Sequence, residues 1–423
     1  MMKEQHVENA TFYGLGIAPK ILEILEKMKI TVPTPIQQKA IPVAIEGKDL
    51  IGVAQTGTGK TLAFTIPIIQ RFSASRGRCL VLTPTRELAL QVDETFSKLA
   101  PAFSIRTAVV IGGSSMEPQI AALRRNPRVI IATPGRLLDH IERRTVVLGD
   151  IDTLVLDEAD RMLDMGFLPD IKKILKIMPG QRQTMLFSAT IPDEILKIAG
   201  AYMKLPIHVE VAPSGTTADN IIQELFIVQR STKKQLLSKI LENACGPILI
   251  FSRTKRGAAE IKRFIKEKGH SAAEIHSDRT LGQRKEALEG FKAGRYKILV
   301  ATDIASRGID VTGIELVVNY DLPEDAEQYV HRIGRTARAG HAGKAISFAT
   351  PEQGKDVINI EKFIKTQLAI REHPDLPGEK FILGYVPKDK PSYRPRPGQG
   401  YRFGSGSSSR PGSSRPFNRH KGR

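Results

Sequence analysis

Short apolar runs that alternate with helix-like stretches set the strongest limit on how this chain can fold. Each run is rich in β-branched residues and bounded by Gly, Pro or polar residues, which predicts a strand buried on both faces. The first half contains Asp49–Ala54, Cys79–Thr83, Thr107–Ile111, Val129–Ala132, Thr153–Leu156 and Thr184–Phe187. The second series is Ile221–Val228, Ile248–Phe251, Ala272–Ile275, Ile298–Ala301, Leu316–Asn319 and Ala345–Ala349. Because strands and helices alternate, the pattern predicts an α/β fold with parallel sheets.

The two series predict two domains, which suits a chain of 423 residues. The small polar stretch Ser214–Asp219 separates them and predicts a hinge. We therefore expect a first domain over residues 1–212, a flexible linker over 213–219 and a second domain over 220–386. Two α/β domains joined in this way form a cleft that can open and close.

Residues 387–423 differ in composition from the rest of the chain and predict a disordered basic tail. From residue 388 onwards, 18 of 36 residues are Pro, Gly or Ser, and ten Lys or Arg with one Asp give a net charge of +9. Such a segment buries too little apolar surface to fold alone. Its four aromatic residues lie among arginines, which favours loose binding of single-stranded nucleic acid, with a purely solubilising tail as the alternative.

The overall charge indicates a polyanionic partner. The chain has 63 Lys and Arg against 45 Asp and Glu, which gives a net charge of +18. A generically basic protein without such a partner is the alternative interpretation. Cys79 and Cys245 lie far apart, with neither disulfide nor metal-ligand spacing, so a reducing cytoplasm fits. The first residues do not resemble a signal peptide, and no run reaches the roughly 18 apolar residues of a membrane span. We therefore expect no membrane partner.

A phosphate-binding loop is predicted where the strand Asp49–Ala54 ends. The loop reads Ala54, Gln55, Thr56, Gly57, Thr58, Gly59, Lys60 and Thr61, and a helix-like run follows it. Glycines let successive N–H groups point at phosphate oxygens, and the helix N-terminus adds partial positive charge. In this pattern Lys60 reaches the β- and γ-phosphates of ATP, and the Thr61 hydroxyl is a Mg²⁺ ligand.

A second motif, the acidic run Asp157–Asp160, follows the predicted strand Thr153–Leu156. Ligands bind at the carboxyl ends of strands in open α/β sheets, so these carboxylates are expected there. Asp157 is predicted to hold Mg²⁺, and Glu158 to orient and deprotonate the attacking water. Alone, an acidic cluster after a strand is usually a charge arrangement at a helix N-terminus, but its pairing with the upstream phosphate loop favours the catalytic interpretation.

The second half carries a basic motif, His331–Arg338, in place of a phosphate loop. Arginines three residues apart lie on one side of a helix. Arg335 and Arg338 are therefore candidates for arginine fingers that neutralise charge on the γ-phosphate. A basic nucleic-acid patch is the alternative.

These motifs resemble the DEAD-box helicase family of superfamily 2, in family order, over roughly residues 12–350. The resemblance implies two tandem RecA-like domains. It implies nucleotide contacts by Phe12, Ile30, Gln37, Gly308 and Asp310, in addition to the phosphate loop, and a motif VI that includes His331. It implies RNA contacts by Pro84, Thr85, Arg86, Gly113, Thr133, Pro134, Gly135, Arg136, Arg253, Gln283, Arg284, Thr302 and Asp303. Ser188, Ala189 and Thr190 resemble the motif that couples hydrolysis to strand separation. The family commonly has Gly and an aromatic or apolar residue at the positions of Lys29 and Ile30, so the resemblance implies that Ile30 contacts adenine by apolar packing rather than by π-stacking.

The resemblance implies an ATP-dependent RNA helicase that uses ATP and Mg²⁺ and binds RNA without sequence specificity. ATP and RNA together close the cleft of such enzymes and bend one strand, which parts a short duplex. The bacterial RhlE-like group, which acts on ribosomal precursors and other RNA–protein complexes, is the most similar subgroup. A processive DNA helicase, and an RNA clamp or annealing chaperone that acts by binding, are the competing functions.

Overall fold

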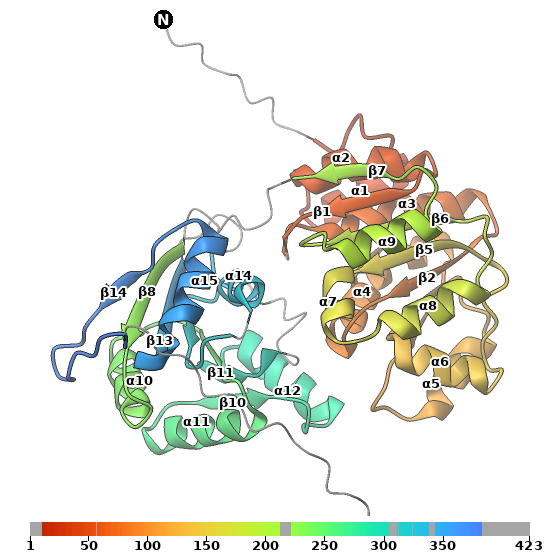
Figure 1. Ribbon diagram of the computed structural model, residues 1–423. Helices are drawn as coiled ribbons and strands as arrows, with labels where there is room; N and C mark the ends of the chain where they lie inside the picture. The colour runs from red at the N-terminus through yellow and green to blue at the C-terminus, as the bar shows by residue number, and fades with distance from the viewer. Residues whose placement is uncertain are drawn as a thin grey trace, which may run out of the picture. The chain divides into compact units, whose positions relative to one another are not determined.

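The computed structural model describes residues 11–55, 57–211, 221–303, 311, 313–323, 325–337 and 343–382. Within these residues the chain forms two seven-stranded sheets, and every strand pair in both is parallel. Helices cover both faces of each sheet (Figure 1). No helix in the described part of the chain is long and apolar enough to cross a membrane.

The first sheet has the strand order β3-β4-β2-β5-β6-β1-β7. Its strands are β1 (Leu50–Val53), β2 (Arg78–Leu82), β3 (Thr107–Val110), β4 (Val129–Ala132), β5 (Ile151–Asp157), β6 (Gln183–Ser188) and β7 (Ile207–Glu210). Its helices are α1 (Pro19–Lys27), α2 (Pro35–Ile45), α3 (Lys60–Ala74), α4 (Arg86–Leu99), α5 (Met116–Arg124), α6 (Pro134–Glu142), α7 (Ala159–Asp164), α8 (Leu168–Ile177) and α9 (Asp193–Tyr202), and a 3-10 turn covers Ala100–Phe103. Helices α1 to α4 pack on one face and α5 to α9 on the other.

The second sheet has the order β10-β11-β9-β12-β13-β8-β14. Its strands are β8 (Ile221–Ile227), β9 (Ile248–Phe251), β10 (Ala272–Ile275), β11 (Ile298–Ala301), β12 (Leu316–Asn319), β13 (Gly343–Ala349) and β14 (Ala369–Arg371). Helices α10 (Lys233–Glu242) and α11 (Lys255–Glu267) cover one face, and α12 (Leu281–Lys292), α14 (Ala326–Ile333) and α15 (Gly354–Ile364) cover the other. A 3-10 turn, Pro351–Gln353, precedes α15.

Alternation of side chains explains why the central strands are apolar throughout. On β9, Ile248 and Ile250 join the core under α10 and α11, while Leu249 and Phe251 join the core under α12. Successive side chains of a strand point to opposite faces, so a strand covered on both sides buries every residue.

All twelve predicted strands are present, and each end lies within two residues of its predicted position. The sequence patterns missed β7, which is largely exposed, and β14, whose three residues are all exposed; each lies at an edge of its sheet. The predicted hinge and the basic tail lie outside the described residues. The fold class is therefore the predicted one, with two parallel-sheet α/β units in tandem.

Candidate functional site

Three neighbouring strands of the first sheet carry the predicted catalytic motifs at their carboxyl ends. Strand β6 lies between β1 and β5 and pairs with both. The phosphate loop follows β1, the Asp157–Asp160 motif follows β5, and Ser188–Thr190 follows β6. Because the strands are parallel, all three motifs lie at one edge of the sheet, where α/β folds bind ligands.

The phosphate loop has the backbone that its sequence predicts. Gly57 and Gly59 both have φ of 86°, in the left-handed region where only glycine is unstrained. Gly59 is the N-cap of α3, and Lys60 is its first residue. The Lys60 Nζ is almost buried and donates a hydrogen bond to the Ala54 carbonyl oxygen at 2.7 Å. Thr58 closes the loop by donating to the Gln55 carbonyl, and Thr56 lies outside the described residues.

Gln37 links the predicted adenine-binding segment to the phosphate loop. Its Oε1 accepts from the Thr34 backbone N–H at 2.9 Å, and its Nε2 donates to the Gly59 carbonyl at 3.0 Å. A carboxamide has two N–H donors and two lone pairs, so one donor and one acceptor remain. This pair matches the N7 acceptor and N6 amino donor of adenine. The same contacts leave no room for a side chain at residue 59, since a Cβ there would lie 2.3 Å from Nε2.

Phe12 and Ile30, the other two expected adenine contacts, differ in exposure. Phe12 is 3% exposed and belongs to the core beneath α1 to α4. Ile30 is partly buried and packs against the same core. A direct adenine contact by either residue stays a prediction.

Asp157 and Glu158 are both buried at the end of β5, but their carboxyl groups are in different electrostatic environments. Burial raises the pKa of Asp157 to about 7, although Lys60 acts in the opposite direction. Burial also raises the pKa of Glu158, but Arg161 and then Lys60 outweigh it, so this pKa is lowered overall. Glu158 is therefore held ionised, whereas Asp157 would lose its proton when a cation binds beside it.

Arg161 is a site residue that the sequence analysis missed. Its guanidinium is 1% exposed, and Nη1 donates to Glu158 Oε2 at 2.9 Å. Glu158 itself has a left-handed backbone, with φ of 52°. The signal was present in the sequence, because residues three apart at the start of a helix are neighbours.

Asp160, also missed, ties the Asp157–Asp160 motif to Ser188–Thr190. Its Oδ2 accepts from the backbone N–H groups of Ala189 and Thr190, at 2.9 and 3.0 Å. The Ser188 hydroxyl in turn accepts from the Asp160 backbone N–H at 3.2 Å. A movement of the Asp157–Asp160 motif would therefore strain Ser188–Thr190, and the reverse. The predicted coupling role of Ser188–Thr190 requires a direct link of this kind.

The three loops of the first sheet that are predicted to contact RNA follow β2, β3 and β4, and the loop after β3 touches both of the others. The Arg86 guanidinium packs on Gly113, where an added Cβ would lie 1.9 Å from Nη1. Arg136 Nη1 donates to the Ser114 carbonyl at 2.9 Å. Thr85 caps α4, while Thr133 and Pro134 begin α6, with Pro84 and Gly135 beside them.

The second unit corrects one prediction. Helix α14 ends at Ile333, and Arg335 lies in the turn that follows. Arg335 therefore does not lie on a helix face as its spacing predicted, because α14 ends at Ile333 with Gly334 as its C-cap. His331 lies in the last turn of α14, whereas Arg338, Gly308 and Asp310 lie outside the described residues.

The remaining predicted RNA residues of the second unit are partly engaged in local structure. Arg332 donates from Nε and Nη2 to the Asp303 carboxylate at 2.6 and 2.7 Å, next to Thr302. Arg253 follows β9 and donates to the Leu322 carbonyl at 3.1 Å. Gln283 forms a capping box with Thr280 at the start of α12, directly before Arg284. Their contacts with RNA stay predictions.

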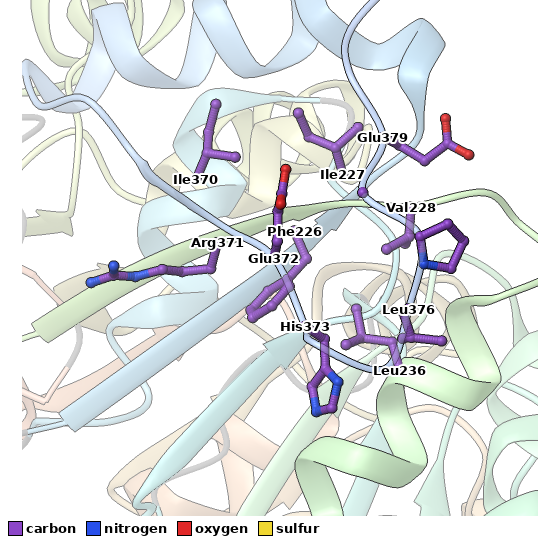
Figure 2. A pocket seen from close by; sticks show the side chains of 12 residues that line it. Phe226, Ile227, Val228, Leu236, Ile370, Arg371, Glu372, His373, Leu376 and Glu379 are labelled. Atoms are coloured by element: carbon purple, nitrogen blue, oxygen red, sulfur yellow. The ribbon is translucent and has the colours of Figure 1, made fainter.

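Two hollows in the second unit lie apart from these motifs. Figure 2 shows one of about 10 Å³, where the segment after β14 folds over Phe226 and Leu236. The other, of about 260 Å³, lies at the amino ends of β9, β12 and β13, beside Cys245. None of the predicted site residues lines either hollow.

Comparison with known proteins decides the family. The DEAD/DEAH box helicase model matches residues 34–198, and the helicase conserved C-terminal domain model matches residues 232–340. The chain belongs to the DEAD-box helicase family. It is 46% identical over 362 residues to the ATP-dependent rRNA helicase RRP3 of Yarrowia lipolytica, covering 85% of this chain and 75% of that protein. It is 43% identical over 369 residues to the DEAD-box ATP-dependent RNA helicase CshA of Geobacillus kaustophilus, covering 86% and 79%.

Solved structures of DEAD-box proteins share the fold. Dbp5 of S. cerevisiae, bound to RNA and ADP BeF3, is similar with a TM-score of 0.77 and 31% identity over 85% of this chain and 95% of that one. Mss116p bound to single-stranded RNA and AMP-PNP gives a TM-score of 0.80 and 27% identity over 89% and 82%. The two sheets of this DEAD-box protein are therefore tandem RecA-like domains.

Proposed function

We propose that this DEAD-box protein is an ATP-dependent RNA helicase that couples RNA-stimulated ATP hydrolysis to local unwinding of short duplexes or remodelling of RNA–protein complexes. The observation that carries the proposal is the convergence of Lys60, Asp157 and Glu158 at adjacent strand ends, where Lys60 acts electrostatically on both carboxylates. A cation on a phosphate loop beside two buried carboxylates is the machinery of phosphoryl transfer to water.

In the proposed reaction, the phosphates of ATP take the place of the Ala54 carbonyl as the partner of Lys60. Mg²⁺ fits the oxygen donors of Thr61 and Asp157, and a buried carboxylate of raised pKa gains its charge when a cation binds beside it. The bound Mg²⁺ would offset charge on the phosphates. Glu158, held ionised by Arg161, orients and deprotonates the attacking water. Arg335, Arg338 and His331 are proposed to neutralise the γ-phosphate when the second domain closes.

RNA is proposed to cross the carboxyl edges of both sheets. The loops after β2, β3 and β4 supply Arg86, Gly113 and Arg136, and the second domain supplies Arg253 and Thr302. Such side chains contact phosphates and sugars and so carry no base information. Discrimination of RNA from DNA then depends on the 2′-hydroxyl.

Four narrower assignments complete the proposal. The domain limits are residues 1–212, 213–219 and 220–386, and residues 387–423 are a basic RNA-binding tail, as their composition indicates. A compact core with a short basic tail favours the bacterial RhlE-like subgroup, while the relatives compared above carry the names RRP3 and CshA. The name of RRP3, an rRNA helicase, supports ribosomal precursors as RNA targets. The two isolated cysteines fit a cytoplasmic protein.

The test is steady-state ATP hydrolysis by the full-length protein alone, with single-stranded RNA, and with DNA of the same sequence. Strong stimulation by RNA alone supports the proposal. Equal stimulation by DNA would favour a general nucleic-acid motor, and no hydrolysis under any condition would favour an RNA clamp or annealing chaperone.

A further inference from the structure

One buried side chain, Gln119, holds the loop that connects β3 to α5. Its Oε1 accepts from the Ile111 backbone N–H at 3.2 Å, and its Nε2 donates to the Ile111 carbonyl at 3.0 Å. The same Nε2 lies 2.8 Å from the Ser114 hydroxyl and 3.0 Å from the Ser115 carbonyl. Gln119 is 6% exposed, so its contacts with both ends of the loop are shielded from water. This single carboxamide therefore sets the path of Gly112 and Gly113.

His140 on α6 extends the network beneath the loop. The ring is fully buried, with Nε2 at 3.3 Å from Gln119 Oε1 and Nδ1 at 2.7 Å from the Thr145 hydroxyl. Acceptors surround the amide nitrogen of Gln119, so the carboxamide end that faces His140 is the oxygen. His140 Nε2 must therefore carry a proton and donate it to this oxygen. Burial, and then Arg136, lower the pKa of His140, which is consistent with a neutral ring in this network.

The network joins two loops that approach RNA in the proposed function. Helix α6 begins with Pro134 and carries Arg136 in its first turn, and Arg136 Nη1 donates to the Ser114 carbonyl. Gln119 and His140 connect the same helix to the Ile111–Ser115 loop from the buried side. On the other side, the Arg86 guanidinium packs against Gly113. The loop is thus fixed by side chains from α4, α5 and α6.

We propose that Gln119, supported by His140, is a positioning residue that holds the Ile111–Ser115 loop and the first turn of α6 in the geometry that binds the RNA backbone. This inference rests on the proposed RNA-binding function. A loop held in its bound conformation loses less conformational entropy when RNA binds, so removing the clamp weakens RNA binding. The clamp touches neither the phosphate loop nor Asp157, so turnover at saturating RNA is preserved.

Gln119→Leu tests this proposal, because leucine preserves most of the volume and removes every polar contact. The matched control is Gln183→Leu. Gln183 is also a buried glutamine of the first sheet, 5% exposed, and its Nε2 donates to the Ala44 and Lys48 carbonyls at 2.9 Å. It lies at the amino end of β6, the opposite end of the strand from Ser188. Both variants lose a comparable clamp of buried backbone carbonyls, but only one is next to the RNA loops.

The measurement is ATPase activity of the full-length protein at saturating ATP, titrated with a poly(U) oligonucleotide. For Gln119→Leu we expect the KM for RNA to rise about tenfold, as preorganised contacts lose their geometry, while kcat and the KM for ATP stay near those of the unmodified protein. His140→Phe removes the Nε2 contact with Gln119 together with the Nδ1 contact with the Thr145 hydroxyl, and it is expected to raise the KM for RNA by a smaller factor. Gln183→Leu is expected to leave it unchanged.

Three outcomes would overturn the positioning role. The first is an unchanged KM for RNA in both Gln119→Leu and His140→Phe. The second is an equal rise in Gln183→Leu, which would show general destabilisation of the domain. The third is a loss of kcat and ATP affinity in proportion to the RNA effect. If Gln119→Leu does not fold, His140→Phe decides the proposal alone. Arg86→Ala distinguishes a failure of the positioning role from a failure of the proposed RNA site. An unchanged KM for RNA in Arg86→Ala would show that these loops do not bind RNA.

Discussion

The buried ion pair of Arg161 and Glu158 allows a quantitative prediction for a substitution that removes the proposed catalytic carboxylate. Glu158→Ala leaves the Arg161 guanidinium, which is 1% exposed, without its carboxylate partner. An uncompensated buried charge costs about 3–5 kcal/mol. Removing Glu158 also relieves its repulsion of Asp157, so we expect the free energy of unfolding to fall by about 3 kcal/mol. At about 2–4 °C per kcal/mol for a domain of this size, the first domain should melt roughly 10 °C lower.

The assay is thermal unfolding of the nucleotide-free full-length protein for the two single variants and the double variant. Arg161→Met alone leaves Glu158 buried without its guanidinium and should destabilise the domain by a comparable amount, whereas Glu158→Ala with Arg161→Met should recover most of the loss. A lower melting temperature for the double variant than for either single variant, or a change under about 2 °C in Glu158→Ala, would refute the reasoning.

Three further predictions concern the nucleotide, protons and salt. Lys60→Ala should abolish ATP turnover, because no other cation of the phosphate loop reaches the phosphates; normal turnover in a phosphate-release assay would reject the site. Burial raises the pKa of Asp157 to about 7, so the folded protein keeps a proton that the unfolded chain releases at a pKa of about 4. The free energy of unfolding should therefore fall as the pH rises through this window, and Asp157→Asn should flatten that fall in denaturant titrations without Mg²⁺. Deleting residues 388–423, with their net charge of +9, should weaken RNA binding and reduce its salt dependence, and an unchanged slope of log Kd against log salt would show that the tail only solubilises.

Local sequence predicted most of the sheets because the central strands are short, mainly apolar runs. Twelve strands were predicted from such runs, whereas β7 and β14 were missed because they are short, largely exposed and mix polar with apolar residues. The helical position of Arg335 was also wrong. The spacing of Arg335 and Arg338 predicted one side of a helix, but α14 ends at Ile333, two residues before Arg335.

The positions of the phosphate loop and the Asp157–Asp160 motif at strand ends could be predicted from the sequence, because each motif consists of adjacent residues whose backbone geometry is set locally. What tertiary structure alone decided are the contacts between segments far apart in the chain. The strand order places Ser188 against Asp160, and the packing of α5 on α6 brings Gln119 to His140. Burial raises the pKa of both carboxyl groups, but at Glu158 the charges of Arg161 and Lys60 outweigh it and keep the group ionised, whereas the pKa of Asp157 stays raised. These outcomes depend on desolvation and on through-space charge, which are set by which side chains the fold packs together and not by their order along the chain.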